Sequence, residues 1–545
     1  MFARVKKSGQ YQYLQIVENR KEAGKVRQQV IATIGRMDEL QEKNRVETLI
    51  RSLSRFSENA LLILSGKSDI SAEARSIGPA LIFERLWKES GIYVAIRRLL
   101  GDRKFEFDVE RAIFLTVLHR LVVSGSDRFC DKWRRDYLVS GIEDLQLDHS
   151  YRAMSFLGEE LEDQKDAMPM APRRNKDLIE EMLFSANRHL FTELDLVFFD
   201  TTSIYFEGQG GKTLGHRGYN KDHRPDLNQI VVGALINDKG RPICCEMWPG
   251  NTADVVTLVP QADRFLKRFG IRNICVVADR GMVSHENLER LKEKGISYII
   301  GARMRLVKEI RMEVLSRAGR YHEVYPENSD RTKPSPLKVK EVLHNDQRYI
   351  VCFNERQARK DAADRQAIIE SLEEQLKKGA GSLVGNKGYR RYLKIEKGSA
   401  RIDMEKAEEE ARFDGKWVLV TDTNLSAEAV ALKYKELWQV ERVFRDMKSM
   451  LETRPVYHYN DASIAGHVFC SFLALVLRKE LEQRLASAGH HFEWPDIKQD
   501  LKALRQIEIY EGDTRFAIRS ECKGHCGKIF QAVKIALPPT IKKLD

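Results

Sequence analysis

The spacing of apolar residues divides the chain into stretches of different predicted structure. From about residue 79 to residue 189 apolar residues recur at the helical period, as in DVERAIFLTVLHRLVV, which predicts packed helices. After residue 194 the pattern changes to short apolar runs that are typical of strands. Five such runs follow in order, namely LDLVFFD, QIVVGALIND, RPICCEMW, ICVVAD and SYIIGAR. Helical spacing returns before and after the fourth run.

The order of these runs indicates an α/β architecture. The first three are close enough in sequence to pair as antiparallel strands through short connections, one of them a turn at residues 238–240. The last two alternate with helices. This is the order of a ribonuclease H-like fold, in which the first and fourth strands are central neighbours. We therefore predict an α/β protein with a core of that class.

Two of the predicted strands end in an aspartate. Asp200 closes the first run and Asp279 closes the fourth, so neighbouring strands would bring the two carboxylates side by side. An ionised acid at the end of a buried strand needs a counter-charge, which a metal ion supplies. Glu441 lies far downstream, in the predicted helix YKELWQVERVFRDMK. Three carboxylates at one sheet end can hold two divalent cations, which promote in-line attack on phosphodiesters. Nucleic-acid chemistry is therefore expected.

The predicted helix around Glu441 has a polar stripe. At 100° per residue, an acid, two bases and two aromatic residues share it with one leucine: Tyr434, Leu437, Trp438, Glu441, Arg445 and Lys448. A stripe that faced the core would be apolar. We therefore expect this stripe to face metal ions and DNA phosphates.

These residues resemble the signature of a known group of enzymes. In spacing, Tyr434, Leu437, Glu441 and Lys448 resemble the Tyr/Arg/Glu/Lys signature of bacterial insertion-sequence transposases with a DDE active site. The phrases FDTTS, RGYNKDHRPDLNQIVVGAL, PGNTAD and ADRGM are similar to the insertion-sequence-four-like branch of that group. The resemblance covers about residues 194–477.

The resemblance implies a role for each matching residue. Asp200, Asp279 and Glu441 would be catalytic metal ligands, and Tyr434 and Lys448 would contact the DNA backbone. The implied cofactor is a pair of Mg²⁺ ions, with Mn²⁺ as a possible substitute. The implied partners are double-stranded DNA, as element ends and as target, and a second copy of the chain in a homodimer.

One position departs from the signature. Leu437 stands where the signature has arginine, and leucine cannot bind a phosphate. Arg445 lies one turn beyond Glu441 on the same predicted stripe, so we expect it to supply the missing contact. Trp438 shares the stripe and is expected at the DNA as well.

Composition shifts suggest several domains, as expected for 545 residues. Between residues 303 and 414 the core pattern is interrupted by a long charged helix and the run KGYRRY. This run contains Arg390 and Arg391, which we expect to contact DNA. We predict an N-terminal hairpin and helix, a helical DNA-binding region, two parts of the catalytic core around an inserted domain, and a C-terminal region: 1–75, 76–190, 191–305 and 415–480 around 306–414, and 481–545.

The overall charge favours a polyanionic partner. The formal net charge is +11 and the pI is about 9.0. Eight scattered cysteines, several of them in apolar runs, suggest reduced thiols and a cytoplasmic protein. No signal peptide is expected, and the longest apolar run, residues 468–477, is shorter than the ~20 residues that span a bilayer. We expect no membrane association.

Other readings of single motifs remain open at this stage. The basic and aromatic segment 132–137 would suit phosphates and bases, or equally a solvated helix face with a buried tryptophan. Cys522, His525 and Cys526 would give three ligands of a zinc site without a fourth. The run from Gly211 to Thr213 is similar to the end of a P-loop, but Phe206 replaces the required glycine, so no nucleotide cofactor is expected.

The predicted function is a DNA transposase that binds the ends of its insertion sequence, cleaves them and joins them to target DNA. Two alternatives remain. A structure-selective nuclease of the same fold would use the same three carboxylates without joining strands. A non-catalytic DNA-binding protein derived from a transposase would have no need of them.

Overall fold

The computed structural model describes residues 2–22, 25–42, 45–46, 72–188, 196–219, 224–325, 336–377, 389–396, 399–451, 453–511 and 514–544. The chain divides into two compact units. The smaller unit comprises Met1–Leu81, Arg135–Leu138 and Phe492–Asp545, and the larger comprises Ile82–Arg134 and Val139–His491.

The smaller unit contains two antiparallel sheets. The alternating pattern near the N-terminus forms the predicted hairpin, because β2 (Tyr11–Glu22) pairs with β3 (Lys25–Arg36), and β1 (Phe2–Ser8) adds a third strand. A short helix, α1 (Met37–Glu42), follows. The second sheet has the order β18-β17-β16-β4. Its strands are β4 (Ala72–Ser76), β16 (Arg505–Glu511), β17 (Thr514–Arg519) and β18 (Ile541–Leu544).

The pairing of β4 with β16 places residues 72–76 and the C-terminal region in one sheet. Ala74 is opposite Ile507 in this pair. The strand β4 therefore crosses the domain boundary that the sequence predicts at residue 75, and it pairs with residues assigned to the C-terminal region. The helices α17 (Trp494–Ala503) and α18 (Cys526–Val533) complete this part of the unit.

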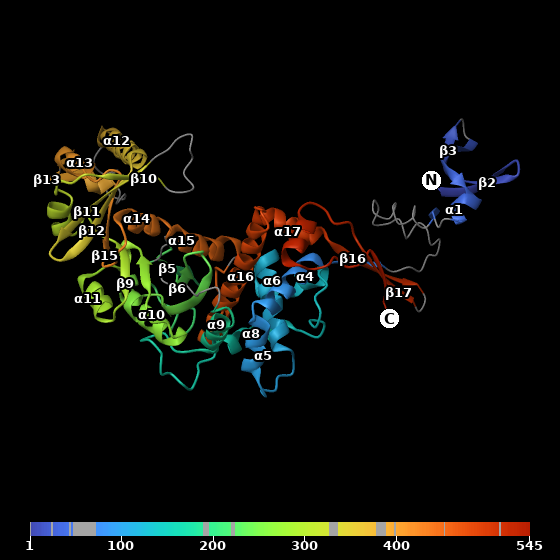
Figure 1. Ribbon diagram of the computed structural model, residues 1–545, viewed down its shortest axis with the longest axis horizontal. Helices are drawn as coiled ribbons and strands as arrows, with labels where there is room; N and C mark the ends of the chain where they lie inside the picture. The colour runs from blue at the N-terminus through green and yellow to red at the C-terminus, as the bar shows by residue number, and fades with distance from the viewer. Residues whose placement is uncertain are drawn as a thin grey trace. The chain divides into compact units, whose positions relative to one another are not determined.

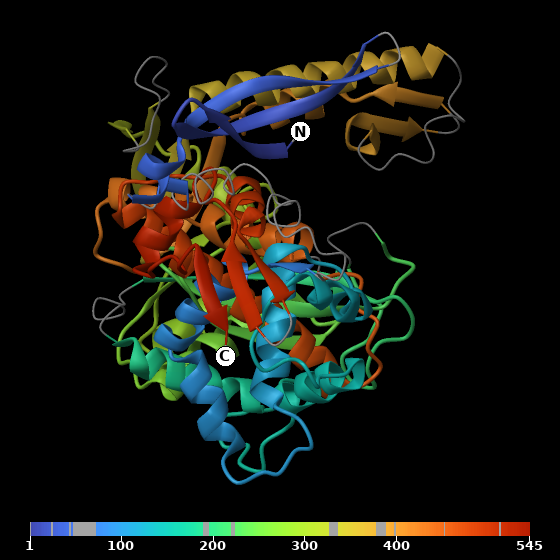
Figure 2. The ribbon, with the colours of Figure 1, turned by 90° about the vertical axis from the view of Figure 1, so that its right-hand side faces the viewer.

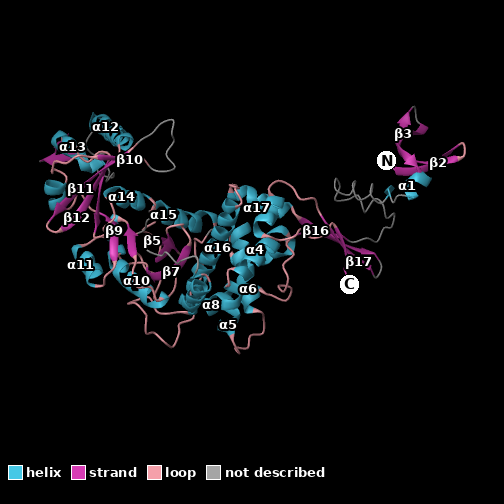
Figure 3. Cartoon of the chain, viewed as in Figure 1, coloured by secondary structure: helices cyan, strands magenta, loops and turns pink. Residues whose placement is uncertain are grey.

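Helices fill the chain between the second sheet of the smaller unit and the first strand of the core. They are α4 (Gly78–Glu89), α5 (Ile92–Leu100), α6 (Val109–Val122), α7 (Asp127–Trp133), α8 (Leu147–Gly158) and α9 (Asn175–Ala186). The helices α6 and α8 pack against the long α16 (Asp461–Ser487), as Figure 3 shows. Among the described residues, α16 is the helix long and apolar enough to cross a bilayer, but 83% of its most apolar window is buried inside the protein. It is therefore a core helix of the larger unit.

A nine-stranded mixed sheet dominates the larger unit. Its strands are β5 (Leu196–Tyr205), β6 (Gln229–Asn237), β7 (Pro242–Pro249), β8 (Cys275–Ala278), β9 (Ser297–Gly301), β10 (His322–Val324), β11 (Leu337–His344), β12 (Gln347–Phe353) and β15 (Lys416–Thr421). The order is β10-β11-β12-β15-β9-β8-β5-β6-β7. The first and fourth core strands, β5 and β8, are parallel neighbours in register, as the order of the apolar runs predicts.

Helices cover both faces of this sheet. Figure 1 shows α10 (Asp254–Phe269) and α11 (His285–Glu293) on one side, and α14 (Ala427–Lys435) and α15 (Trp438–Arg445) on the other. The main hydrophobic core lies on the α10 side and takes alternate strand residues, among them Phe199, Ala278 and Ile300. Successive strand side chains point to opposite faces. Asp200, which follows Phe199 within β5, therefore points toward the face that α14 and α15 cover.

The segment predicted as an inserted domain is partly continuous with the core. Its strands β10, β11 and β12 extend the large sheet and pair through β12 with β15. The rest forms a small cluster of its own, in which α12 (Glu355–Lys377) lies beside the hairpin of β13 (Leu393–Glu396) and β14 (Ser399–Ile402), together with α13 (Met404–Ala411) (Figure 2). The strands β10, β11 and β12 therefore belong to the core sheet and not to a separate domain. The other domain boundaries stay a prediction.

Candidate active site

The two predicted aspartates lie at the same end of the sheet. The last parallel pair between β5 and β8 joins Phe199 to Ala278, and Asp200 and Asp279 are the next residues. The prediction that the strand ends at Asp200 is wrong, because β5 continues to Tyr205 by pairing with β6. Only its pairing with β8 stops there. Both carboxylates are partly exposed.

The third carboxylate lies on a helix that packs across this edge. The helix α15 contacts β5 and β6, and α14 contacts β8 and β9. Glu441 is an exposed residue of α15. Asp200, Asp279 and Glu441 thus belong to elements that meet on one face of the sheet, the face opposite the main core.

A tyrosine connects the helix to the second aspartate. The hydroxyl of Tyr434 donates a hydrogen bond to Asp279 Oδ1 over 3.3 Å. Burial, and then the charge of Asp279, raise the pKa of Tyr434 well above its usual value, and the charge of Glu441 adds to this. The phenol therefore stays protonated and acts as a donor. Gly301, at the end of β9, leaves room for it, because a Cβ at this position would lie 2.4 Å from the Tyr434 hydroxyl.

The helix that carries these residues is broken, although the sequence predicts a continuous one. The α14 helix ends at Lys435, and α15 begins at Trp438 after tight hydrogen bonds of the i+3 type, such as Leu437 N to Tyr434 O at 3.1 Å. The wider π-helix η8 (Asp446–Met450) follows. A tight turn and then a wide turn change the rotation per residue. The residues from Tyr434 to Lys448, which a regular helix would align on one stripe, therefore do not all lie on the same face.

A cavity of about 1140 Å³ opens beside Asp279 and Glu441. Tyr434, Leu437 and Trp438 also lie on its wall. Basic residues outnumber acidic ones around it, and the basic ones are Arg280, Arg303, Arg305, Arg311, Arg391, Lys406, Lys416 and Lys435. A hollow with this excess of positive charge attracts polyanions.

The predicted DNA-binding residues fall into different places. Trp438, which is 53% exposed, and Arg391 both line the cavity. Arg390 belongs to the turn η7 (Tyr389–Tyr392), but its side chain lies outside the described residues. Arg445 is exposed at the end of α15, and Lys448 lies in η8. Neither of these last two is part of the cavity wall.

Two supporting contacts are not evident from the sequence patterns. Arg303 donates from Nε to the carbonyl of Arg280 at 3.1 Å and from Nη2 to the carbonyl of Gly281 at 2.8 Å, which holds the turn after Asp279. Thr201, the neighbour of Asp200, donates its hydroxyl to Asp254 Oδ1 at 2.6 Å. The phrases ADRGM and PGNTAD contain the acceptors of these contacts, but their spacing alone does not reveal the donors.

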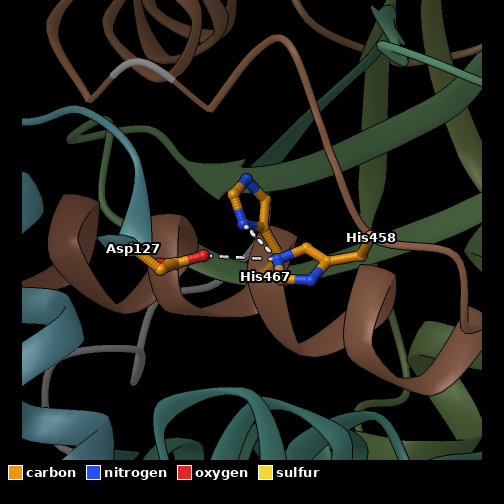
Figure 4. Close-up of side chains that lie close together, drawn as sticks. All are labelled: Asp127, His458 and His467. Carbon is orange, nitrogen blue, oxygen red and sulfur yellow. Dashed lines mark hydrogen bonds and ion pairs between the residues drawn. The ribbon is translucent and has the colours of Figure 1, made fainter. Parts of the chain in front are cut away.

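Among the described residues, metal-type ligand atoms converge at two places, and neither place includes the three predicted carboxylates. The first consists of Asp127, His458 and His467 (Figure 4). His458 Nε2 lies 3.4 Å from Asp127 and 3.1 Å from His467 Nδ1. Arg120 lies 2.9 Å from the same His467 Nδ1.

The contacts of this first cluster define a hydrogen-bond network. His467 Nε2 faces the carbonyl of Thr453 at 3.1 Å, so it donates and leaves Nδ1 as the acceptor for Arg120. Burial, and then the charge of Arg120, lower the pKa of His467 well below its usual value. A metal ion would compete with a guanidinium for the same lone pair. We therefore interpret the cluster as a structural connection between α6, α7 and α16.

The second cluster is a buried network of ion pairs. Its acids, Asp177, Glu180 and Glu246, are matched by three bases, Lys176, Arg264 and Arg268. Lys176 also donates to the carbonyl of Cys245 at 2.7 Å, and Glu180 accepts from the Cys245 amide at 3.0 Å. These side chains of α9 thus satisfy the backbone of the edge strand β7. Because three bases balance the three acids, the cluster is a structural network of ion pairs rather than a metal site.

Burial and ring contacts bear on two single motifs, segment 132–137 and the group Cys522, His525 and Cys526. Trp133 and Tyr137 are buried, which favours the structural reading of segment 132–137 because bases cannot stack on buried rings. His525 stacks on Phe492 with ring centroids 3.9 Å apart. Cys522, His525 and Cys526 are not among the ligand clusters of the described residues. Zinc binding gains no support there.

Comparisons with known proteins agree with the predicted class. Residues 192–477, just over half of the chain, match the family model described as transposase DDE domain. Residues 3–67 match the N-terminal domain of the IS1634 family transposase. Among curated proteins, none matches the chain.

A solved structure of the piggyBac transposase synaptic complex with hairpin DNA is 11% identical and has a TM-score of 0.38. The match covers 78% of this chain and 79% of that chain. At this low similarity, the match assigns neither a fold nor a function to this chain.

Proposed function

Because the chain belongs to the transposase DDE domain family, we propose that it cleaves the ends of an insertion sequence at a site formed by Asp200, Asp279 and Glu441 and joins them to target DNA. It is a bacterial insertion-sequence DDE transposase, a metal-dependent enzyme that acts on DNA. The assignment to the insertion-sequence-four-like branch remains a proposal, since the N-terminal match is to the IS1634 family.

One observation carries the assignment of the site. Asp200 and Asp279 directly follow the last parallel pair of β5 and β8 and share the face that α14 and α15 cover. Two acids that directly follow the same strand pairing repel each other unless a positive charge lies between them. The order β7-β6-β5-β8-β9 within the sheet supports a ribonuclease H-like core around them.

The side chains at this edge fit a divalent cation. Carboxylate oxygens are the preferred ligands of Mg²⁺ and Mn²⁺, and the family implies a divalent metal. We assign Asp200, Asp279 and Glu441 as the ligands of two Mg²⁺ ions. When bound, the metal activates the attacking water or 3′-hydroxyl and stabilises charge on the phosphate.

The protein's own residues prepare this chemistry. Strand pairing fixes the backbone of Asp200, and Arg303 fixes the turn after Asp279 through two backbone carbonyls. Tyr434 orients the Asp279 carboxylate by its hydrogen bond. We further propose that Trp438, Arg445, Lys448, Arg390 and Arg391 contact DNA, with Arg445 in place of the signature arginine that Leu437 replaces.

The active complex is proposed to be a homodimer, because two element ends have to be held together. We also propose a cytoplasmic location, since the cysteines are free thiols and most of them are buried.

The test uses charge-neutral variants of the three carboxylates. We expect Asp200→Asn, Asp279→Asn and Glu441→Gln each to lower cleavage by more than about a hundredfold, because each removes a metal ligand worth several kcal/mol in the transition state. The substrate is a duplex with the inverted repeats that flank the reading frame, in Mg²⁺. Glu286→Gln, an exposed change on α11, serves as the control.

The same assay separates the alternatives. Joined product in the presence of target DNA identifies a transposase, whereas cleavage without joining would identify a nuclease. Cleavage that survives in all three variants would show that the site lies elsewhere.

A further inference from the structure

One carboxylate beside the cavity is held by two arginines. Glu410, on α13, accepts a hydrogen bond at Oε2 from Arg305 Nε at 3.0 Å. The same oxygen also accepts from Nη2 of Arg391. Arg305 follows β9, whereas Arg391 belongs to the turn η7, so two distant segments converge on one oxygen atom.

This arrangement has the geometry of an oxyanion site. Arginine guanidinium groups recognise phosphate oxygens through the same directed N–H bonds that they offer to carboxylates. The Arg305 guanidinium also lies over the Phe413 ring, 5.2 Å from its centroid, which limits its movement. A phosphate oxygen at the position of Glu410 Oε2 would therefore meet two donors that are already in place.

The surroundings point to nucleic acid as the ligand. Arg305, Arg391 and Glu410 line the same cavity as Asp279 and Glu441, and its wall carries an excess of basic side chains. Glu410 is 15% exposed, while Arg305 and Arg391 are 36% and 42% exposed. The arginines are thus open to a ligand, and the carboxylate lies behind them.

We propose that Arg305 and Arg391 bind a backbone phosphate of the DNA next to the active site, and that Glu410 occupies the phosphate position until DNA displaces it. The inference rests on the proposed function, because the cavity is that of the proposed active site. Glu410 then acts as an internal competitor that lowers the affinity for DNA in general. A DNA strand regains that affinity only where it reaches the cavity and replaces the carboxylate.

The neighbouring residue on α13 provides a matched control. Glu409 also lines the cavity, but it pairs with Arg311 at 3.9 Å and with Arg412 at 3.7 Å. Glu409→Gln removes the same charge from the same helix as Glu410→Gln. A difference between the two variants therefore reports position and not net charge.

The experiment measures binding of a fluorescent 30-base-pair duplex to the full chain without divalent metal, over a series of salt concentrations. We expect Glu410→Gln to bind about three- to tenfold more tightly than Glu409→Gln, since one neutral hydrogen-bonding group replaces a charged competitor. Arg305→Gln combined with Arg391→Gln should weaken binding and reduce the slope of log K against log salt by about 0.9, which corresponds to one lost phosphate contact.

Three results would overturn the proposal. Equal affinities of the two glutamine variants would mean a general charge effect, and weaker binding by Glu410→Gln would mean that the carboxylate positions the arginines. An unchanged salt slope in the double arginine variant would mean that neither arginine contacts a DNA phosphate. Because binding is measured without metal, these results do not depend on cleavage, so failure of the proposed catalytic site appears separately in the carboxylate variants.

Discussion

The hydroxyl of Tyr434 donates a hydrogen bond to the carboxylate of Asp279 over 3.3 Å. This contact connects the end of α14 with the residue after β8, which are 155 positions apart. Since burial and the nearby acids keep the phenol protonated, the hydrogen bond orients one carboxylate oxygen and leaves the other available to the metal ion that we propose there. The resemblance implies that this tyrosine contacts the DNA backbone, and the two roles make different predictions.

Tyr434→Phe removes only the hydroxyl. A hydrogen bond to a charged group contributes ~1.5–3 kcal/mol, so we expect cleavage to fall about tenfold or more and the half-saturating Mg²⁺ concentration to rise. Metal-free DNA affinity should stay unchanged. Tyr457→Phe, at a residue 57% exposed, is the control. Weaker metal-free binding by Tyr434→Phe would instead support the direct DNA contact.

Gly301→Ala should disturb the same contact by a steric route. The added methyl group would lie 2.4 Å from the Tyr434 hydroxyl, so the ring has to move away from Asp279. We expect cleavage to fall about as far as in Tyr434→Phe, and the double variant to lose little more than Tyr434→Phe alone. Gly319→Ala, where the nearest atom is 3.6 Å away, controls for the added methyl group. Fully additive losses in the double variant would show that Gly301 acts independently of Tyr434.

Lys176→Met should destabilise the larger unit. The change leaves Asp177, Glu180 and Glu246 with one cation fewer and frees the carbonyl of Cys245. Removing one partner of a buried ion pair costs ~3–5 kcal/mol, which a lowered midpoint in chemical denaturation would reveal. Lys88→Met, at an exposed pair with Glu84, should change the midpoint little. Equal effects of the two variants would contradict the structural role of the network.

Acidification should destabilise the fold through its buried histidines. Burial lowers the pKa of His119 to about 4 and that of His467 well below the usual value. Between pH ~6.5 and pH ~4 the unfolded chain therefore binds protons that the folded protein does not. The free energy of unfolding then decreases by up to ~1.4 kcal/mol per histidine for each unit by which the pH is lowered.

His119→Phe tests the sign and size of this effect. His119 packs between Phe129 and Trp133, and its Nε2 has no hydrogen-bond partner among the described residues. The variant should therefore show a smaller loss of stability on acidification, measured as the unfolding midpoint at several pH values. His285→Phe, at an exposed position, should keep the dependence of the unchanged protein. A slope unaffected by His119→Phe would assign the acid sensitivity to other groups.

Much of the catalytic core is determined by the sequence alone. The runs LDLVFFD and ICVVAD become β5 and β8, and their order along the chain makes them parallel neighbours with Asp200 and Asp279 at one end. The alternating N-terminal segment becomes the pair β2 and β3. The strands themselves follow from local side-chain periodicity, which favours a strand before any distant segment packs against it.

Other features were decided only by the tertiary structure. The turn between α14 and α15, the continuation of β5 past Asp200 and the addition of β10 to β12 to the sheet all depend on which distant segments pair and pack. The contacts of Tyr434 with Asp279, of Arg303 with the turn after Asp279, and of Glu410 with two arginines have no signature in spacing. Each of these contacts joins groups that are distant in sequence and that many packing contacts bring together. The partner of such a side chain is therefore determined by the whole fold and not by its sequence neighbours.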